Sequence, residues 1–331
     1  MSALGAVVRL LRYVTDPVAL FSFNRMGFAL NRRGFVPGDL PLDAAGRIAL
    51  VTGANSGIGR ATSLELARRG FDVWMLCRDA ARGAEARDAI ARECGEARVH
   101  LAIVDMSSLR SIRRFAKDFP MNRVDVLVHN AGVLPDEKKL TDDGVELTFA
   151  TSVLGPFALT SLLQAQLARS VDARVIFVAS GGLYLQRLDL SLLEVDAAHF
   201  DGTRAYANAK RAQVVLAHTL AERFADRPQI TFASMHPGWA DTTAVRTSLP
   251  KFHALMQRVL RSAEQGADTV VWLAASDHPK GTRGSFWFDR RVAPEYPVPW
   301  TRESPADRQK LVDLCEQISG ATLETLPGEA A

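Results

Sequence analysis

From residue 47 onward, short runs of apolar and β-branched residues alternate with longer segments of helical periodicity. The pattern predicts strands over residues 48–52, 72–77, 99–104, 124–129, 175–179 and 230–234, and its first two helices over 58–69 and 81–93. Strands that are apolar without alternation and are separated by helices are typical of a parallel sheet covered on both faces. We therefore expect an α/β fold with a doubly wound parallel sheet.

The N-terminal region departs from this alternation. Leu4, Val7, Val8, Leu11 and Val14 recur at helical spacing, and residues 1–33 contain five arginines and one aspartate. We predict an amphipathic helical extension over residues 1–40, a single domain over 41–320 and a tail over 321–331. A basic amphipathic helix can lie on an anionic membrane surface. The alternative is a helix that packs on the domain or on a partner subunit.

Composition excludes several classes of function. The chain has 331 residues, 47% of them hydrophobic, with a net charge of +3 that gives no reason to expect nucleic acid as a partner. Its three cysteines form no CxxC pair and its histidines no HExxH spacing, so we predict neither a disulfide framework nor a metal site. No apolar run reaches the roughly 18 residues of a spanning helix. We predict a cytoplasmic protein, with peripheral membrane contact through the N-terminal helix as a further expectation.

A glycine-rich turn follows the first predicted strand and opens the first predicted helix. Glycines permit a tight turn and a close approach of the backbone to a pyrophosphate, and the free N–H groups of the helix favour the anion. Because the strand–turn–helix context is present, a dinucleotide site is preferred over glycines that simply end a strand. The predicted cofactor-binding residues of the turn are Gly53, Asn55, Ser56, Gly57, Ile58 and Gly59.

The spacing TGxxxGIG of this turn resembles that of the short-chain dehydrogenase/reductase family. Other segments, in the same order, are similar to that family's NAG, YxxxK and PGxxxT motifs, and the resemblance covers about residues 47–242. It implies a Rossmann fold, a nicotinamide cofactor and hydride transfer between a carbonyl and an alcohol. The further cofactor-binding residues that it implies are Asp105, Asn130, Ala131, Gly132, Tyr206, Lys210, Pro237, Gly238 and Thr242.

Some segments narrow the resemblance within the family. Residues 77–79, 141–144 and 154–157 are similar to the retinol-dehydrogenase-like members. Residues 206–215, 234–242 and 265–269 are similar to a smaller branch, that of family member twelve. This branch is largely without assigned substrates, so the resemblance names a reaction type but no substrate.

Tyr206 and Lys210 are the central catalytic candidates. They are four residues apart on a predicted helix and therefore share one face. A free tyrosine has a pKa of about 10; a nearby ammonium, together with a positively charged nicotinamide ring, favours the phenolate. Tyr206 would then exchange a proton with the reacting oxygen. The resemblance implies that Lys210 also holds the nicotinamide ribose and that Ser180, at the end of the fifth strand, hydrogen-bonds the reacting oxygen.

Ser152 stands where many family members have a fourth catalytic residue, an asparagine. A serine hydroxyl can donate and accept hydrogen bonds, but its reach is shorter. We predict that Ser152 is catalytic and binds a water molecule, with slower turnover. The replacement also keeps an alternative open, a nucleotide-binding regulatory or scaffold protein with weakened catalysis. A third alternative, an epimerase-like relative, is disfavoured by the compact glycine spacing.

The residues after the second strand bear on cofactor choice. NAD-specific enzymes usually have an acid at the end of this strand. Here the neutral Cys77 is followed by Arg78, and a guanidinium suits a 2′-phosphate. We favour NADP(H), while the nearby Asp79 keeps NAD(H) open.

An insert between Ser180 and Tyr206 suggests an apolar substrate. Its residues and others further along could line a cleft for a lipophilic carbonyl or alcohol, although several fit an ordinary core equally well. These residues are Leu134, Gly181, Gly182, Leu183, Tyr184, Trp239, Leu249, Phe252 and Leu255. The resemblance further implies a homodimer paired through the helix that carries Tyr206 and Lys210.

Overall fold

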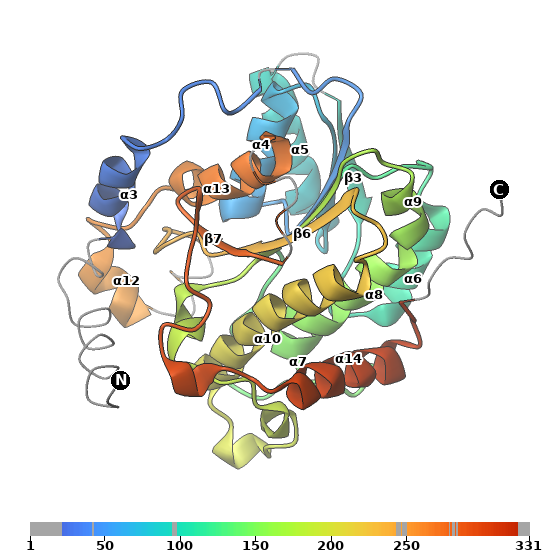
Figure 1. The fold of residues 1–331 in the computed structure, drawn as a ribbon, viewed down its shortest axis with the longest axis vertical. Helices are drawn as coiled ribbons and strands as arrows, with labels where there is room; N and C mark the ends of the chain where they lie inside the picture. Colours follow the sequence, from blue (N-terminus) through green and yellow to red (C-terminus); the bar gives the residue numbers. More distant parts are fainter. Residues whose placement is uncertain are drawn as a thin grey trace.

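The computed structural model describes residues 22–323, except residues 42, 95–97, 243–245, 247–249, 278, 280, 281 and 283. Figure 1 shows the sheet between two layers of helices. Within the described part, this sheet has the strand order β3-β2-β1-β4-β5-β6-β7-β8. Strands β1 to β7 run parallel, and β8 pairs antiparallel with β7. The predicted doubly wound sheet is thus confirmed. The strands are β1 (Ile48–Thr52), β2 (Asp72–Cys77), β3 (Val99–Ile103), β4 (Val126–His129), β5 (Ala173–Val178), β6 (Ile230–Met235), β7 (Phe286–Phe288) and β8 (Arg291–Val292).

Helices cover both faces of the sheet. One face carries α4 (Gly57–Arg68), α5 (Ala80–Cys94) and α13 (Ala263–Ala275). The other carries α6 (Leu109–Asp118), α8 (Gly155–Leu162) and α10 (Gly202–Arg223), with α14 (Pro305–Ser319) packed on α8 and α10. The remaining elements are α3 (Arg25–Arg32), α7 (Leu147–Phe149), α9 (Gln164–Ala168), α12 (Pro250–Met256), η1 (Ala150–Leu154), η2 (Gly181–Leu185), η3 (Leu190–Leu193), η4 (Ala197–His199) and η5 (Pro299–Thr301).

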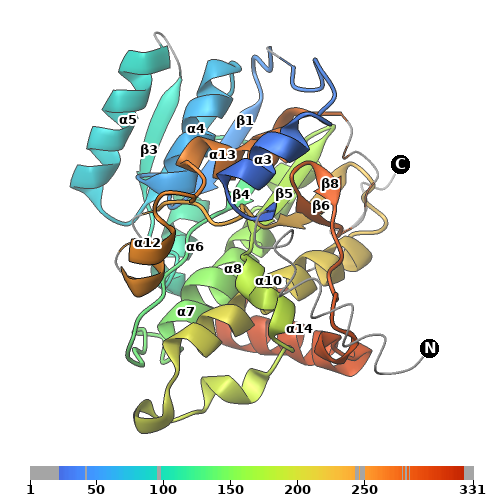
Figure 2. The ribbon, with the colours of Figure 1, turned by 90° about the vertical axis from the view of Figure 1, so that its left-hand side faces the viewer.

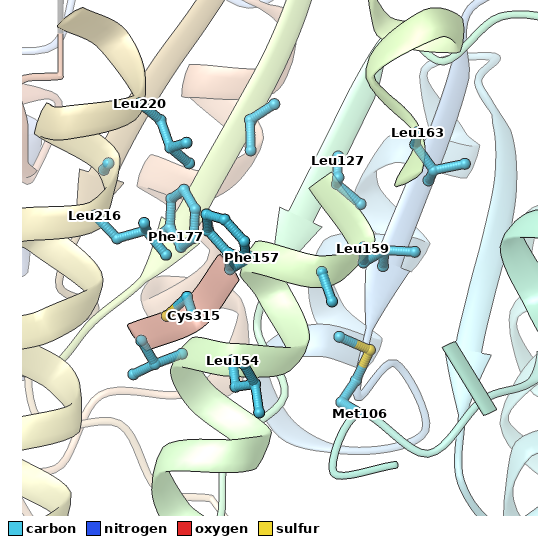
Figure 3. Packing of buried hydrophobic residues seen from close by; sticks show 14 of the residues in the cluster. Met106, Leu127, Leu154, Phe157, Leu159, Leu163, Phe177, Leu216, Leu220 and Cys315 are labelled. Atoms are coloured by element: carbon cyan, nitrogen blue, oxygen red, sulfur yellow. The ribbon is translucent and has the colours of Figure 1, made fainter. Parts of the chain in front are cut away.

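The C-terminal helix belongs to the core. Phe157 of α8 lies beside Phe177 of β5, Leu216 and Leu220 of α10 and Cys315 of α14 (Figure 3). All five side chains are fully buried, and burial of each phenylalanine or leucine contributes about 1.5–3 kcal/mol. Because α14 lies on α10, homodimer pairing through α10, which stays a prediction, would have to use the part of that helix that α14 leaves uncovered.

The hairpin β7–β8 was not indicated by the sequence pattern. Strand β7 has three residues, and its two-residue turn contains no glycine. Asp289 and Arg290 nevertheless adopt φ angles of 48° and 57°, in the left-handed region that glycine or asparagine usually occupies. Ion pairs hold the turn: Asp289 pairs with Arg261, and Arg290 with Asp39 and Asp268.

The described part of the N-terminal extension packs on the domain. Helix α3 begins after Asn24, whose side chain accepts hydrogen bonds from the backbone of Met26 (2.8 Å) and Gly27 (3.1 Å). Phe28 is buried beneath the Arg261 guanidinium. The predicted helix from Leu4 to Val14 lies outside the described residues. None of the helices that the structure describes has the length and apolar character to span a bilayer.

Candidate active site

The turn between β1 and α4 is built as a close-fitting cradle. Gly53 and Gly57 have φ angles of 65° and 52°. A Cβ atom on Gly59 would lie 2.4 Å from both the Gly53 oxygen and the Asn130 Nδ2 atom, so only glycine fits there. Ser56, the N-cap of α4, makes no side-chain capping bond within the described chain. The first N–H groups of α4 therefore remain for an anion, and the cradle fits a dinucleotide pyrophosphate.

The NAG segment braces this turn. Asn130 Nδ2 donates to the backbone oxygens of Thr52 (2.9 Å) and Gly53 (3.2 Å). Thr52 Oγ1 accepts from the backbone N–H groups of Asn130 and Ala131, both at 3.0 Å, and donates to the Val128 oxygen. The Asn130 amide thus holds the cradle in shape. Sequence reasoning missed Thr52, although its position directly before Gly53 is a usable signal.

Residues 237–242, after β6, fold against the same turn. A Cβ atom on Gly57 would lie 3.2 Å from Thr242 Cγ2. Gly238 has a φ of 74°, and a Cβ there would lie 2.4 Å from Arg261 Nε. His236 Nδ1 accepts from the Gly238 N–H at 3.1 Å, so this histidine shapes the loop. The PGxxxT segment is therefore placed over the glycine cradle.

Ser180, Tyr206 and Lys210 come together near the carboxyl end of β5. Ser180 follows β5, while Tyr206 and Lys210 lie on α10. The Lys210 Nζ atom lies 5.4 Å from the centre of the Tyr206 ring. The Ser180 side chain lies close enough to Tyr206 to lower the pKa of its hydroxyl, and Ser180 Oγ accepts from the Gly182 N–H at 3.4 Å. The structure thus brings together three of the four predicted catalytic residues, with Ser180 and Lys210 each close to Tyr206 in the contacts above.

The fourth, Ser152, lies on the Lys210 side of this group. A Cβ on Gly132 would lie 3.5 Å from Lys210 Nζ and 3.7 Å from Ser152 Oγ, so both groups reach the same point beside the NAG segment. Ser152 belongs to η1, a π-helical turn, and such turns often occur at functional sites. Its buried hydroxyl has no hydrogen-bond partner among the described residues.

Lys210 is held by two acceptors. Its Nζ donates to the Val178 oxygen and to Gln213 Oε1, both at 2.9 Å. Gln213 is fully buried three residues further along α10. Sequence reasoning missed this glutamine, and its i,i+3 spacing from Lys210 is the signal that could have found it.

Burial shifts the pKa values of both α10 residues. It raises the pKa of Tyr206, and the nearby Ser180 hydroxyl offsets this only in part. Burial also lowers the pKa of Lys210 to about 7. The expectation that Lys210 favours the phenolate is thus outweighed within the chain itself, because desolvation penalises both charged forms. Tyr206 is therefore protonated at neutral pH.

Two charged residues follow β2, and only the second, Asp79, has an ion-pair partner among the described residues. Cys77 is fully buried, whereas Arg78 is exposed and makes no ion pair or hydrogen bond within the described chain. Asp79 caps α5 by accepting from the Arg82 N–H (2.9 Å) and Nε (3.2 Å), which lowers the pKa of its carboxyl group. Arg78 alone is thus available to a ligand at this strand end.

Asp105 lies after β3, at the position expected for an adenine contact. Its Oδ1 atom accepts from the N–H and the hydroxyl of Ser107, at 2.9 and 2.7 Å. The side chain is partly exposed. Asp105 therefore shapes this turn, while its contact with adenine stays a prediction.

The predicted apolar lining separates into core and surface residues. Leu183 is fully buried and Tyr184 is 7% exposed, both in a small cluster with Phe286. Trp239 and Leu134 are partly exposed, whereas Leu255 is 82% exposed. Leu249 and the Phe252 side chain lie outside the described structure. The core interpretation thus holds for Leu183, and Trp239 stays a candidate for the cleft.

A buried arginine, Arg211, holds the segment after Ser180, and sequence reasoning missed it. It donates to the backbone oxygens of Leu183 (3.0 Å), Gln186 (3.0 Å) and Glu295 (2.9 Å). Its guanidinium also lies over the Tyr296 ring, 4.9 Å from the centre. Arg211 therefore joins the segment after Ser180 to the C-terminal part of the chain.

Comparison with known proteins agrees with this geometry. A family model described as short chain dehydrogenase matches residues 47–252. Dehydrogenase/reductase SDR family member 12 of Homo sapiens is 43% identical over 304 residues, covering 91% of this chain and 95% of the relative. Retinol dehydrogenase 11 of Mus musculus is 32% identical over 257 residues, covering 75% and 79%.

Comparison with solved structures also finds proteins with a similar fold. A crystal structure of an uncharacterised protein from Mycobacterium paratuberculosis has a TM-score of 0.71 and 28% identity, covering 88% of this chain and 99% of that one. A protein described as an NAD(P)-dependent gluconate 5-dehydrogenase from Beutenbergia cavernae, with bound NADP, has a TM-score of 0.59 and 26% identity, covering 74% and 96%. The glycine cradle, the YxxxK pair on α10 and the matches over most of the chain make this protein a member of the short-chain dehydrogenase/reductase family.

Proposed function

We propose that the chain is an NADP(H)-dependent oxidoreductase that interconverts a lipophilic carbonyl compound and its alcohol, with Tyr206 as the acid/base. The observation that carries this proposal is the meeting of Ser180, Tyr206 and Lys210 beside a braced glycine cradle. The NADP bound to a structural neighbour and the retinol dehydrogenase among the relatives support it.

Tyr206 and Ser180 have different roles at the reacting oxygen of the substrate. A bound nicotinamide cofactor would supply or accept the hydride. In reduction, the Tyr206 hydroxyl donates its proton to the carbonyl oxygen. The raised pKa of Tyr206 keeps it in the protonated form that this direction requires. Ser180 donates a hydrogen bond to the same oxygen and stabilises the charge that develops there.

Lys210 stabilises the phenolate that Tyr206 leaves behind. An ammonium group has three donors, and Val178 and Gln213 accept two of them. The third serves the nicotinamide ribose or a water molecule bound by Ser152, whose buried hydroxyl reaches toward the same point. With a pKa of about 7, Lys210 can also give up and regain a proton near neutrality.

The preference for NADP(H) rests on the residues after β2. The exposed Arg78 makes no ion pair with another described residue, so its guanidinium can bind a 2′-phosphate bidentately. The Asp79 carboxylate, the group that would favour NAD, is occupied by Arg82 at the start of α5. Cys77 is buried and uncharged, which removes repulsion of the phosphate.

Substitution of the tyrosine tests the proposed reaction. We expect wild-type protein to consume NADPH with an apolar aldehyde or ketone, and Tyr206→Phe to reduce kcat by about 10²- to 10⁴-fold. NADPH binding should be retained in the variant, since the glycine cradle is untouched. Equal turnover in the two proteins would contradict the assignment of Tyr206.

Ser152 favours a second candidate, a nucleotide-binding protein with weakened catalysis. Its hydroxyl replaces a longer carboxamide and has no partner among the described residues. A wild type that binds NADPH but turns over no carbonyl, together with a Ser152→Asn variant that does, would support this candidate. If Ser152→Asn instead abolishes an existing turnover, the serine is an adapted part of the site.

A further inference from the structure

The described part of the N-terminal extension is joined to the cofactor loop by main-chain hydrogen bonds. We call residues 22–32 the N-terminal strap; its helix α3 lies beside α13 in both views (Figures 1 and 2). The Phe23 oxygen accepts from the Trp239 N–H at 2.8 Å, and the Arg25 N–H donates to the Val259 oxygen at 3.0 Å. The Arg261 N–H in turn donates to the Trp239 oxygen at 2.8 Å. Three distant segments thus meet beside the PGxxxT loop.

A buried ion pair fixes this junction. Arg261 and Asp289 are 1% and 2% exposed, with contacts of 2.6 and 2.8 Å from the two terminal guanidinium nitrogens. Arg261 also donates to the backbone oxygens of Ser22 (2.7 Å), Asn24 (3.3 Å) and Pro237 (3.3 Å). These contacts match the five donors of a guanidinium, as a buried charge requires. The strap is therefore held firmly at Ser22 and Asn24, on both sides of Phe23.

The Phe23 ring consequently lies among aromatic groups next to the catalytic serine. Its centre is 6.1 Å from that of Tyr184, 4.8 Å from His236 and 5.7 Å from Trp239. Gly181, the residue directly after Ser180, has no side chain, and a Cβ there would lie 3.9 Å from Phe23 Cε2. The ring keeps part of its surface exposed. A partly exposed aromatic ring thus lies against Gly181, the residue that follows Ser180 in the sequence.

We propose that Phe23 determines substrate specificity by forming one apolar wall of the substrate site. The inference rests on the proposed function, because it concerns the same carbonyl/alcohol pair. Phe23 contacts the apolar part of the substrate beyond the reacting carbon, and the Arg261–Asp289 pair holds it in place. The fitting substrates are carbonyl compounds with a medium-length alkyl chain or an aromatic ring. The strap, the described part of the N-terminal extension around Phe23, is accordingly part of the active site.

Chain-length selectivity tests this role. The quantity measured is the ratio of kcat/KM for octanal to that for propanal, with NADPH as the second substrate. We expect Phe23→Ala to lower this ratio about tenfold, mainly through KM for octanal, since lost apolar contacts typically cost 10-fold or more. Phe35→Ala is the matched control, because Phe35 lies against Phe28 and Arg290, away from Gly181. It should leave the ratio within about twofold of wild type.

A second variant and a binding measurement make the test complete. Phe23→Leu keeps an apolar side chain and should lose only about threefold in the ratio, and melting temperatures show whether each variant is folded. An unchanged ratio in Phe23→Ala or, where that variant does not fold, in Phe23→Leu overturns the inference. If wild type reduces neither aldehyde, the proposed function fails for this class, and octanal binding is then followed by tryptophan fluorescence. If octanal binds more weakly to the Phe23 variants than to wild type and Phe35→Ala, the proposed role of Phe23 is supported. If octanal binds all of these proteins equally, or does not bind wild type, the inference is overturned.

Discussion

The two sides of the site are held together in different ways. On the cofactor side, Gly53, Gly59 and Asn130 form a cradle from motifs that each span a few residues. On the substrate side, the buried Arg211 and Arg261 bind backbone oxygens of segments far apart in the sequence. The residues of the cofactor side therefore lie in short recognisable motifs, although Gly53 and Asn130 are 77 residues apart, while the substrate side depends on buried arginines that belong to no motif.

Breaking the long-range contacts should have the largest effect on stability. Arg261→Met leaves the Asp289 carboxylate buried without its partner, which typically costs about 3–5 kcal/mol. Arg246→Met removes an exposed pair with Asp241 and should cost less than about 1 kcal/mol. Urea denaturation of the two variants gives both free energies of unfolding. Similar values would show that the strap junction is not a stabilising element.

The second largest effect is expected for a change in the glycine cradle, which should weaken cofactor binding. In Gly59→Ala, the new methyl group would lie 2.4 Å from the Gly53 oxygen and from Asn130 Nδ2, so the turn must shift. Overpacking of this kind costs roughly 1–3 kcal/mol, and we expect the Kd for NADPH to rise about 10- to 100-fold. Gly182→Ala is the control on the substrate side, because among the described residues its Cβ would meet only Ser180 Oγ, at 3.9 Å. Equal Kd values for both variants would contradict the cradle.

The pH dependence of stability tests Lys210, which lies between the cofactor side and the substrate side of the site. Burial lowers its pKa from 10.5 to about 7, so between these values the unfolded chain binds a proton that the folded chain does not. The free energy of unfolding should therefore rise with pH across this window, by about 1.4 kcal/mol per pH unit from this group. Lys210→Met should lack this contribution. Parallel curves for wild type and variant would show that Lys210 stays charged in the folded state.

Elements with local signals could be predicted well. Strands β1 and β2 have the predicted bounds, because each is a short apolar run between a charged residue and a turn. The glycine cradle and the YxxxK pair were equally visible, since their chemistry depends on fixed spacing along one turn or one helix. Ser180 and Ser152 were found only through their order relative to these motifs.

Elements that depend on distant partners could not be predicted. The turn at Asp289 and Arg290 lacks glycine and is stabilised by arginine and aspartate partners from other parts of the chain. Phe23 lies before the first strand, and nothing in its neighbours indicates contact with Trp239. Desolvation of Tyr206 and Lys210 likewise arises from the packed fold, so its effect on their pKa values could not be inferred from spacing.

Titration with NADPH and NADH, followed by energy transfer from tryptophan to the reduced nicotinamide, tests the central claim most directly. Trp239 lies in the PGxxxT loop over the cradle, so a bound nicotinamide should quench it. We predict saturable binding of both nucleotides with a clear preference for NADPH, and a loss of about tenfold or more in NADPH affinity in Arg78→Ala, as expected for a charge-assisted contact. Failure to bind either nucleotide would contradict the oxidoreductase account, and equal affinities unaffected by Arg78→Ala would contradict the assignment of NADP(H).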